Sequence, residues 1–131
     1  MKFMLMMQGT RSGWESMGSW SPADIQAHIR FMKDLNKELT SSGELVLAEG
    51  LDLPHNAKIV RAEKTSATVV TDGPFAESKE FLAGFWIVEC ASQKRVIEIA
   101  AKASTAPGRG GVPIGIPIEV RQVMSAPNIE E

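Results

Sequence analysis

The sequence predicts an α+β fold of the ferredoxin-like kind, an antiparallel sheet with helices packed on one face. Two observations lead to this prediction. Apolar segments follow one another in the order strand, helix, strand, a hairpin-like pair, strand, helix, strand, which places two strand–helix–strand units side by side. The chain has 131 residues, of which 44% are hydrophobic and 23% charged, as in an ordinary globular domain. We therefore expect residues 1–131 to form a single domain.

The strands are expected where apolar and β-branched residues run between turn residues. They are predicted at residues 2–8, 44–51, 58–63, 68–71, 82–90 and 117–124. The first strand is apolar on both of its faces, so we expect it to be covered on both sides. The strand at 82–90 is long and apolar, which indicates a central position. An apolar sheet face left without helices would be covered by a second copy in a sheet-to-sheet dimer.

Two helices are expected. The first begins at Ser21, which can accept a backbone N–H as N-cap, and Pro22 suits the first helical position. Its apolar stripe, expected to face the core, consists of Ile25, Ile29, Met32, Leu35 and Leu39. The helix should end at residues 41–43, where Gly43 can adopt the left-handed conformation. Ser92 can cap a second helix that runs to about residue 103.

Two connections are long. Residues 9–20 are polar and glycine-rich, and we expect them to form a loop that carries two large apolar side chains, Trp14 and Trp20. Residues 104–116 are rich in glycine and proline and are expected to form a second loop, which is mobile. One hypothesis makes this second loop a lid from which Arg109 reaches an anionic group of a substrate.

The composition argues against several function classes. A net charge of −2, without any block of like charges, argues against nucleic-acid binding and against a membrane-surface role. The apolar run near the N-terminus is too short for a signal peptide or a spanning helix, so we expect a cytoplasmic protein. The single cysteine, Cys90, lies in an apolar strand and is expected to be a buried thiol.

Neither a metal nor another cofactor is predicted. The two histidines, His28 and His55, and the lone cysteine give no metal-binding spacing. The glycines at 108–111 follow a predicted helix and precede a strand, which is the reverse of the context of a dinucleotide-binding loop.

Asp72 and Glu77 are the first candidates for chemistry. Asp72 precedes Gly73-Pro74, which stiffens the turn. It either braces this turn by accepting backbone N–H groups, or acts as a rigidly held catalytic base. Glu77 either belongs to a solvated charged loop or converges with Asp72 on a cleft. Repulsion between two such carboxylates would suit one of them to acid–base chemistry near neutral pH.

His28 and Glu49 are the next candidates. His28 lies at the edge of the apolar stripe, either half-buried and bonded to a neighbour or facing a cleft as an acid–base group, because histidine ordinarily changes charge near neutral pH. Glu49 interrupts an apolar strand, and charged residues inside sheets are seldom unpaired. We expect Glu49 to form an ion pair with Arg121 or Arg61 or, as the alternative, to supply a carboxylate to a cleft.

The run from Val70 to Glu80, which contains Asp72-Gly73-Pro74-Phe75, resembles the signature of the DGPF group of YCII-related proteins. Three further stretches, at 43–51, 82–88 and 117–121, are similar to the strands of that family in the same order. The resemblance implies a ferredoxin-like fold and a dimeric α/β barrel. It also implies a catalytic His–Asp pair, whose histidine would fall near Met32, about one helical turn after His28.

The resemblance leaves the reaction open. The wider superfamily includes enzymes like muconolactone isomerases and dehydrochlorinases, which implies a cofactor-free enzyme that performs acid–base isomerisation or elimination on a small ring compound. Asp72 and His28 would then be the acid–base pair, with Trp14, Trp20 and Phe75 as pocket walls. One alternative is a non-catalytic dimer that binds a small molecule or acts as a regulatory accessory protein. The links of the family with extracytoplasmic-function sigma factors imply this alternative. The other is a dimer whose DGPF motif is wholly structural.

Overall fold

The computed structural model describes residues 1–64, 67–73 and 80–125. Its elements in chain order are β1 (Lys2–Gly9), α1 (Arg11–Met17), α2 (Pro22–Ser41), β2 (Leu45–Gly50), η1 (Pro54–Asn56), β3 (Ala57–Ala62), β4 (Thr68–Gly73), β5 (Phe81–Glu89), α3 (Gln93–Ser104), η2 (Arg109–Gly111) and β6 (Ile118–Gln122). The six predicted strands and the two predicted helices are confirmed, with bounds that differ by at most two residues.

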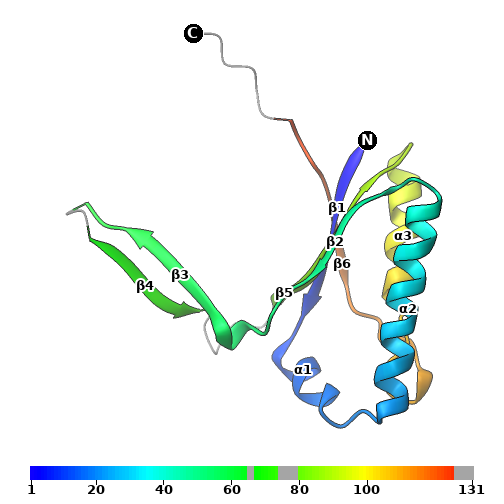
Figure 1. Ribbon diagram of the computed structural model, residues 1–131, viewed down its shortest axis with the longest axis horizontal. Helices are drawn as coiled ribbons and strands as arrows, with labels where there is room; N and C mark the ends of the chain where they lie inside the picture. The colour runs from blue at the N-terminus through cyan, green and yellow to red at the C-terminus, as the bar shows by residue number, and fades with distance from the viewer. Residues whose placement is uncertain (65–66, 74–79, 126–131) are drawn as a thin grey trace.

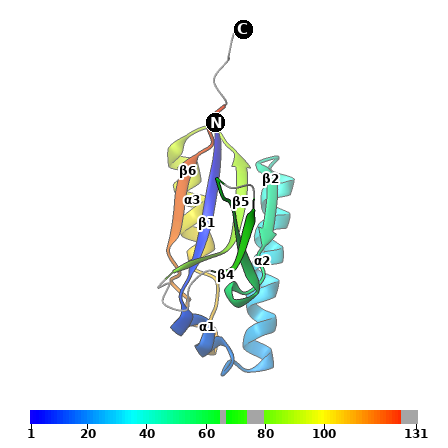
Figure 2. The ribbon, with the colours of Figure 1, turned by 90° about the vertical axis from the view of Figure 1, so that its left-hand side faces the viewer.

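Four strands form one antiparallel sheet in the order β2-β5-β1-β6 (Figure 2). β5 therefore occupies the central position that its long apolar sequence predicts. Both long helices lie on the same face of the sheet, as Figure 1 shows, with α2 behind β2 and β5 and α3 behind β1 and β6 in the view of Figure 2. The prediction of an antiparallel sheet with its helices on one face is thus confirmed.

The core lies between this face and the helices. Alternate residues of the central strands, among them Leu5, Trp86 and Val88, point at α2 and α3 and are buried. Leu35 and Leu39 of α2 join them, but Ile25 and Ile29 are 40% and 48% exposed. The expectation that the whole apolar stripe of α2 faces the core is wrong for the first two turns.

The opposite face carries no helix. The pairing register places Met4 beside Ile87 and Met6 beside Phe85, and these side chains are half-buried within the chain. Leu47 extends this apolar surface onto β2, where it pairs with Ile87. Met4, Met6, Leu47, Phe85 and Ile87 are called the open face below. The expectation that β1 is covered on both sides is therefore wrong for a single chain.

The ends of α2 follow its sequence. The Ser21 hydroxyl accepts the backbone N–H of Asp24 at 3.1 Å, and Pro22 stands at the first helical position. At the other end Gly43 has a φ of 79°, and Glu44 N–H donates to the Leu39 carbonyl at 2.9 Å. This closure satisfies carbonyls of the last turn, as the glycine predicts.

The connection at residues 9–20 contains a helix that the sequence reading missed. The hydroxyl of Thr10 accepts the N–H of Gly13 at 3.0 Å, and Arg11 pairs with Glu15 one turn later at 3.0 Å. These local bonds offset the cost of nucleating a seven-residue helix in a glycine-containing segment. The expectation of a continuous loop here is wrong.

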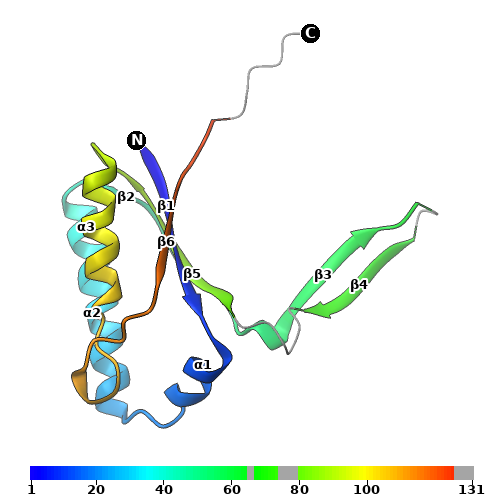
Figure 3. The same ribbon diagram turned by 180° about the vertical axis from the view of Figure 1, so that it is seen from behind.

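Strands β3 and β4 form a separate two-stranded antiparallel hairpin, called the arm below. The arm projects from the helix-free side of the sheet (Figures 1 and 3). Gly73, the last residue of β4, is buried at its root against the side chain of Ile59, and there is no room there for a Cβ.

An ion pair that the sequence did not reveal ties Glu44, the residue before β2, to α3. The guanidinium of Arg95 donates from Nε and Nη2 to the two carboxylate oxygens of Glu44, each at 2.8 Å. This two-pronged hydrogen bond lowers the pKa of Glu44 from 4.5 to about 2.

No helix among residues 1–64, 67–73 and 80–125 has both the length and the apolar character required to cross a membrane.

Candidate functional site

A cavity of about 220 Å³ lies between α2 and the β2–β5 part of the sheet, and is called the helix–sheet pocket below. Its lining residues are Met7, His28, Met32, Asn36, Ala48, Glu49, Gly50, Ala83, Gly84, Phe85 and Trp86. An apolar cavity of about 150 Å³ can bind benzene, so this one has room for a molecule of one ring with substituents.

Small residues in the sheet create this space. Ala48 and Gly50 on β2 lie on the helix-facing side, where Gly50 pairs with Gly84 of β5. A Cβ added to Gly50 would meet nothing within 4 Å, because it would project into the pocket. A Cβ on Gly84 would instead lie 2.9 Å from the carbonyl oxygen of Glu49. Gly50 thus keeps the pocket empty, and Gly84 allows the two strands to approach each other.

His28 is half-buried and lines the pocket from α2. Its Nδ1 lies 3.0 Å from the carbonyl oxygen of Pro107, and its ring meets Trp20 edge-on with centroids 5.7 Å apart. A carbonyl oxygen can only accept, so Nδ1 carries the proton. In the neutral ring Nε2 then holds a lone pair, and among the described residues it has no hydrogen-bond partner. The ring is positioned so that Nε2 can accept a proton from a ligand.

Asn36 supplies the second polar group, two helical turns after His28. Its Oδ1 accepts the indole N–H of the buried Trp86 at 2.7 Å. Because Trp86 can only donate, this bond fixes the orientation of the amide. The Nδ2 group of Asn36 has no partner among the described residues and remains a donor in the pocket. The pocket therefore combines apolar walls with one acceptor, Nε2 of His28, and one donor, Nδ2 of Asn36.

Two other cavities lack this combination. One of about 350 Å³ lies at the root of the arm, and its one carboxylate, Asp52, is bonded to Leu53 N–H and to Asn56. The other lies beside the end of β6 and includes Lys2 and Glu89 on an open surface. Within the described ranges, no three His, Cys, Asp or Glu side chains are grouped so as to hold a metal ion.

The structure does not bring Asp72 and His28 of one chain together. Asp72 lies within β4 on the exposed arm, on the opposite side of the sheet from α2 (Figure 1). Its carboxylate pairs across the arm with Lys58, which holds the pKa of Asp72 below its usual range. Phe75 and Glu77, the other candidates of the DGPF segment, lie outside the described residues.

The predicted pocket walls separate in the structure. Trp20 is buried and contacts His28, so it positions a residue of the helix–sheet pocket. Trp14 is 37% exposed on α1, and its ring lies against His55 at a centroid distance of 5.9 Å. Arg109 is exposed on η2 and does not line the pocket.

The loop that contains Arg109 is held by backbone hydrogen bonds. Gly108 N–H donates to Val112 at 2.7 Å, and Ile114 N–H donates to Ala106 at 2.8 Å. The Pro107 carbonyl, which orients His28, belongs to this bonded segment.

Glu49 belongs to the β2 segment that lines the pocket, but it forms no ion pair among the described residues. It pairs in register with Phe85, so its side chain lies on the sheet face away from α2 and is exposed. β2 and β6 are the two outer strands, which places Glu49 and Arg121 about 14 Å apart across three strand spacings. Arg61 lies out on the arm. The expected ion pair with Arg121 or Arg61 is therefore wrong.

Sequence reasoning did not identify Asn36 and the small strand residues as pocket residues. The sequence contained a signal for each. Asn36 lies four residues after Met32, on the buried side of α2. Glycine is unfavourable in a strand unless open space or the close approach of another strand requires it. Pro107 could not be identified in this way, because it contributes a backbone carbonyl.

Comparison with known proteins gives the family. The family model described as the YCII-related domain matches residues 1–112. An uncharacterized protein of Rhizobium meliloti (strain 1021) is 31% identical over 88 residues, which cover 67% of this chain and 70% of that protein. The chain belongs to the YCII-related family.

Proposed function

We propose that the helix–sheet pocket is the active site of a cofactor-free enzyme that moves a proton on a small ring compound bearing a carbonyl group. The observation that carries this proposal is the hydrogen bond between His28 Nδ1 and the Pro107 carbonyl, which leaves Nε2 as a base at an apolar cavity. A ring compound of that type matches the size of the cavity, its apolar walls and its single donor and acceptor.

The reaction would begin when Nε2 of His28 removes a proton from the carbon next to the carbonyl group. The C–H electron pair moves into the ring, and negative charge develops on the carbonyl oxygen, which the Nδ2 group of Asn36 stabilises by donating a hydrogen bond. In an isomerisation, the imidazolium returns the proton to another carbon. In an elimination, a leaving group departs with its electron pair and the imidazolium loses its proton to water.

Deuterium exchange tests this proposal directly. Lactones and cyclic ketones are first screened by thermal shift, and those that raise the melting temperature are incubated with the protein in D₂O. Proton NMR then reports loss of the signal at the carbon next to the carbonyl group. Enzyme-dependent exchange supports the proposal. Stabilising ligands that never exchange would contradict it.

A non-catalytic binding module is the second candidate function. It is favoured by the absence, among the described residues, of a carboxylate hydrogen-bonded to His28, since His–Asp pairs ordinarily supply that orientation. In this case the pocket would retain ligands without turnover, as a regulatory accessory protein requires. The same experiment separates the two functions, because only the enzyme exchanges deuterium.

We further infer a ferredoxin-like arrangement and a homodimer joined through the open face. The strand order β2-β5-β1-β6 with both long helices on one face supports the first inference. The apolar side chains of the open face support the second, since a sheet surface of this kind is stable when another sheet covers it. Sedimentation velocity over a range of concentrations tests the dimer.

A further inference from the structure

We propose that the arm is a clasp, which reaches past the sheet of a second copy of this chain and holds it. This inference rests on the dimer proposed above. Its starting point is that the arm is poorly supported by its own chain. An isolated two-stranded hairpin is marginally stable in water, yet the sequence of the arm is rich in β-branched residues.

The apolar side chains of the arm lack a cover. Val60 and Val70 face each other across the two strands and are 63% and 58% exposed. Ile59, which lies on the other face of the arm, is 38% exposed even though it covers Gly73. The Lys58–Asp72 ion pair marks the root of the face that carries the two valines. Such a face is suited to an apolar partner surface.

The second copy is the partner that fits the position of the arm. The arm leaves the body on the side of the open face, so a molecule stacked on that face would lie alongside it (Figures 1 and 3). The margin of the open face carries charges of both signs. In the pairing register, Arg121 lies next to Met4 and Glu119 lies next to Met6. In a two-fold interface, where the same surface faces itself, each of these charges can meet its opposite.

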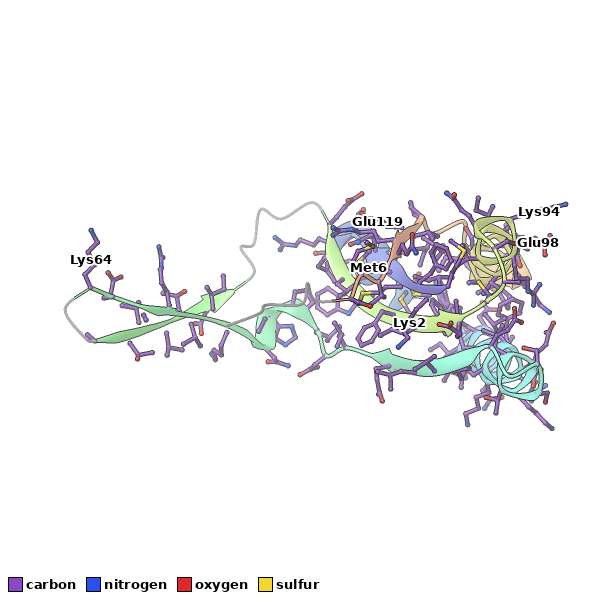
Figure 4. The ribbon with its side chains drawn as sticks, turned by 90° about the horizontal axis from the view of Figure 1, so that it is seen from above. Lys2, Met6, Lys64, Lys94, Glu98 and Glu119 are labelled. Atoms are coloured by element: carbon purple, nitrogen blue, oxygen red, sulfur yellow. The ribbon has the colours of Figure 1, made fainter. Side chains whose placement is uncertain are left out.

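The length of the arm decides what it touches. Each of its strands has six residues, which span about 20 Å at about 3.3 Å per residue, whereas packed sheets lie about 10 Å apart. The tip would therefore pass the sheet of the second copy and end near the layer of its helices. Figure 4 shows Lys64 at this tip, on the opposite side of its own molecule from Lys94 of α3.

Isotope-labelled cross-linking tests the position of the tip. Equal amounts of unlabelled and ¹⁵N-labelled protein are mixed, allowed to exchange subunits and treated with a lysine-reactive cross-linker. We expect mixed-isotope links from Lys64 to the helix lysines of the other copy, which are Lys33, Lys37, Lys94 and Lys102. Links from Lys64 that join only peptides of the same isotope, or no links from Lys64 to the helices, would overturn the clasp.

Matched variants separate the clasp from the dimer. Val60→Lys with Val70→Glu replaces the apolar pair by a cross-strand ion pair that preserves the register of the arm. We expect this variant to raise the dimer dissociation constant at least tenfold in sedimentation experiments. The control Val112→Lys alters a 65% exposed residue that lies outside the arm, the open face and the two long helices, and should leave the constant unchanged.

Met6→Glu, in the open face, reports on the dimer itself and should give monomers. If Met6→Glu dissociates the dimer while the double arm variant leaves the constant unchanged, the clasp is wrong and the dimer stands. A wild-type protein that is monomeric at every concentration would overturn both inferences and leave the pocket proposal intact.

Discussion

Nδ1 of His28 on α2 lies 3.0 Å from the carbonyl oxygen of Pro107, 79 residues further along the chain. This bond joins the helix that lines the pocket to the loop that follows α3. It determines which ring nitrogen carries the proton, and no side chain other than the histidine takes part in it. Residue substitutions can therefore remove the imidazole but cannot remove its acceptor.

The first prediction concerns His28→Gln. Glutamine retains a polar side chain of similar length but cannot act as a base at neutral pH. We expect deuterium exchange into a bound carbonyl compound to fall by about 10²–10⁴-fold, the usual contribution of a general base. The thermal shift caused by the same ligand should remain. Exchange at the wild-type rate would remove His28 from the mechanism.

The second prediction concerns Gly50→Leu, which fills the pocket from β2. The new side chain would project into open space, so the fold should be kept while ligand-induced thermal shifts and deuterium exchange are both lost. Val46→Leu on the same strand is the control, because Val46 is 52% exposed and outside the pocket. Unchanged ligand binding by Gly50→Leu would place the binding site elsewhere.

The third prediction compares alanine at two glycines that face each other in the β2–β5 register. Gly84→Ala places a Cβ 2.9 Å from the Glu49 carbonyl oxygen and should destabilise the protein by about 1–3 kcal/mol, because backbone atoms must shift. Gly50→Ala meets no atoms and should be neutral or slightly stabilising. Urea unfolding measures both changes. Equal effects at the two positions would contradict the described register.

The fourth prediction concerns acid stability. Arg95 lowers the pKa of Glu44 in the folded state from 4.5 to about 2, so this carboxylate stabilises the fold fully above pH 4.5. The contribution falls as the pH drops from 4.5 towards 2 and is absent below 2. We expect about 1–2 kcal/mol at neutral pH, reduced by solvent screening because Arg95 is 37% exposed.

Urea unfolding of Glu44→Gln at pH 7 and at pH 2 measures this contribution. The variant should be destabilised at pH 7, and most of that difference from the wild type should be lost at pH 2. Glu98→Gln is the control, since Glu98 is 52% exposed and makes a single 3.3 Å contact with Arg95. If the free energy of unfolding of Glu44→Gln differed from that of the wild type by the same amount at both pH values, the stability lost in the variant would come from packing and not from the ion pair.

The local features of the fold were predictable from the sequence because they depend on neighbouring residues. Ser21, Pro22 and Gly43 define the ends of α2 through bonds within a few residues, and the apolar run of β5 indicates its central place. The short helix α1 was missed because its stability depends on weak local bonds, from Thr10 and Arg11, in a segment with poor helix propensity.

The candidate site was less predictable because its geometry depends on contacts between distant segments. His28 could be proposed from its residue type, but its partner is a backbone group in a loop far along the chain. The proposed pairing of His28 with Asp72 followed from residue types alone. The topology places these two residues of one chain on opposite sides of the sheet, and only a second copy could bring an Asp72 closer.

The arm follows the β2 segment that lines the pocket, with η1 between them, and β5, the next strand after the arm, also lines the pocket. A ligand in the pocket and a subunit held by the arm therefore contact segments that are neighbours along the chain. Their free energies of binding should be linked, and the linkage must be reciprocal. If a ligand lowers the dissociation constant of the dimer by some factor, the ligand must also bind the dimer more tightly than the monomer by that factor.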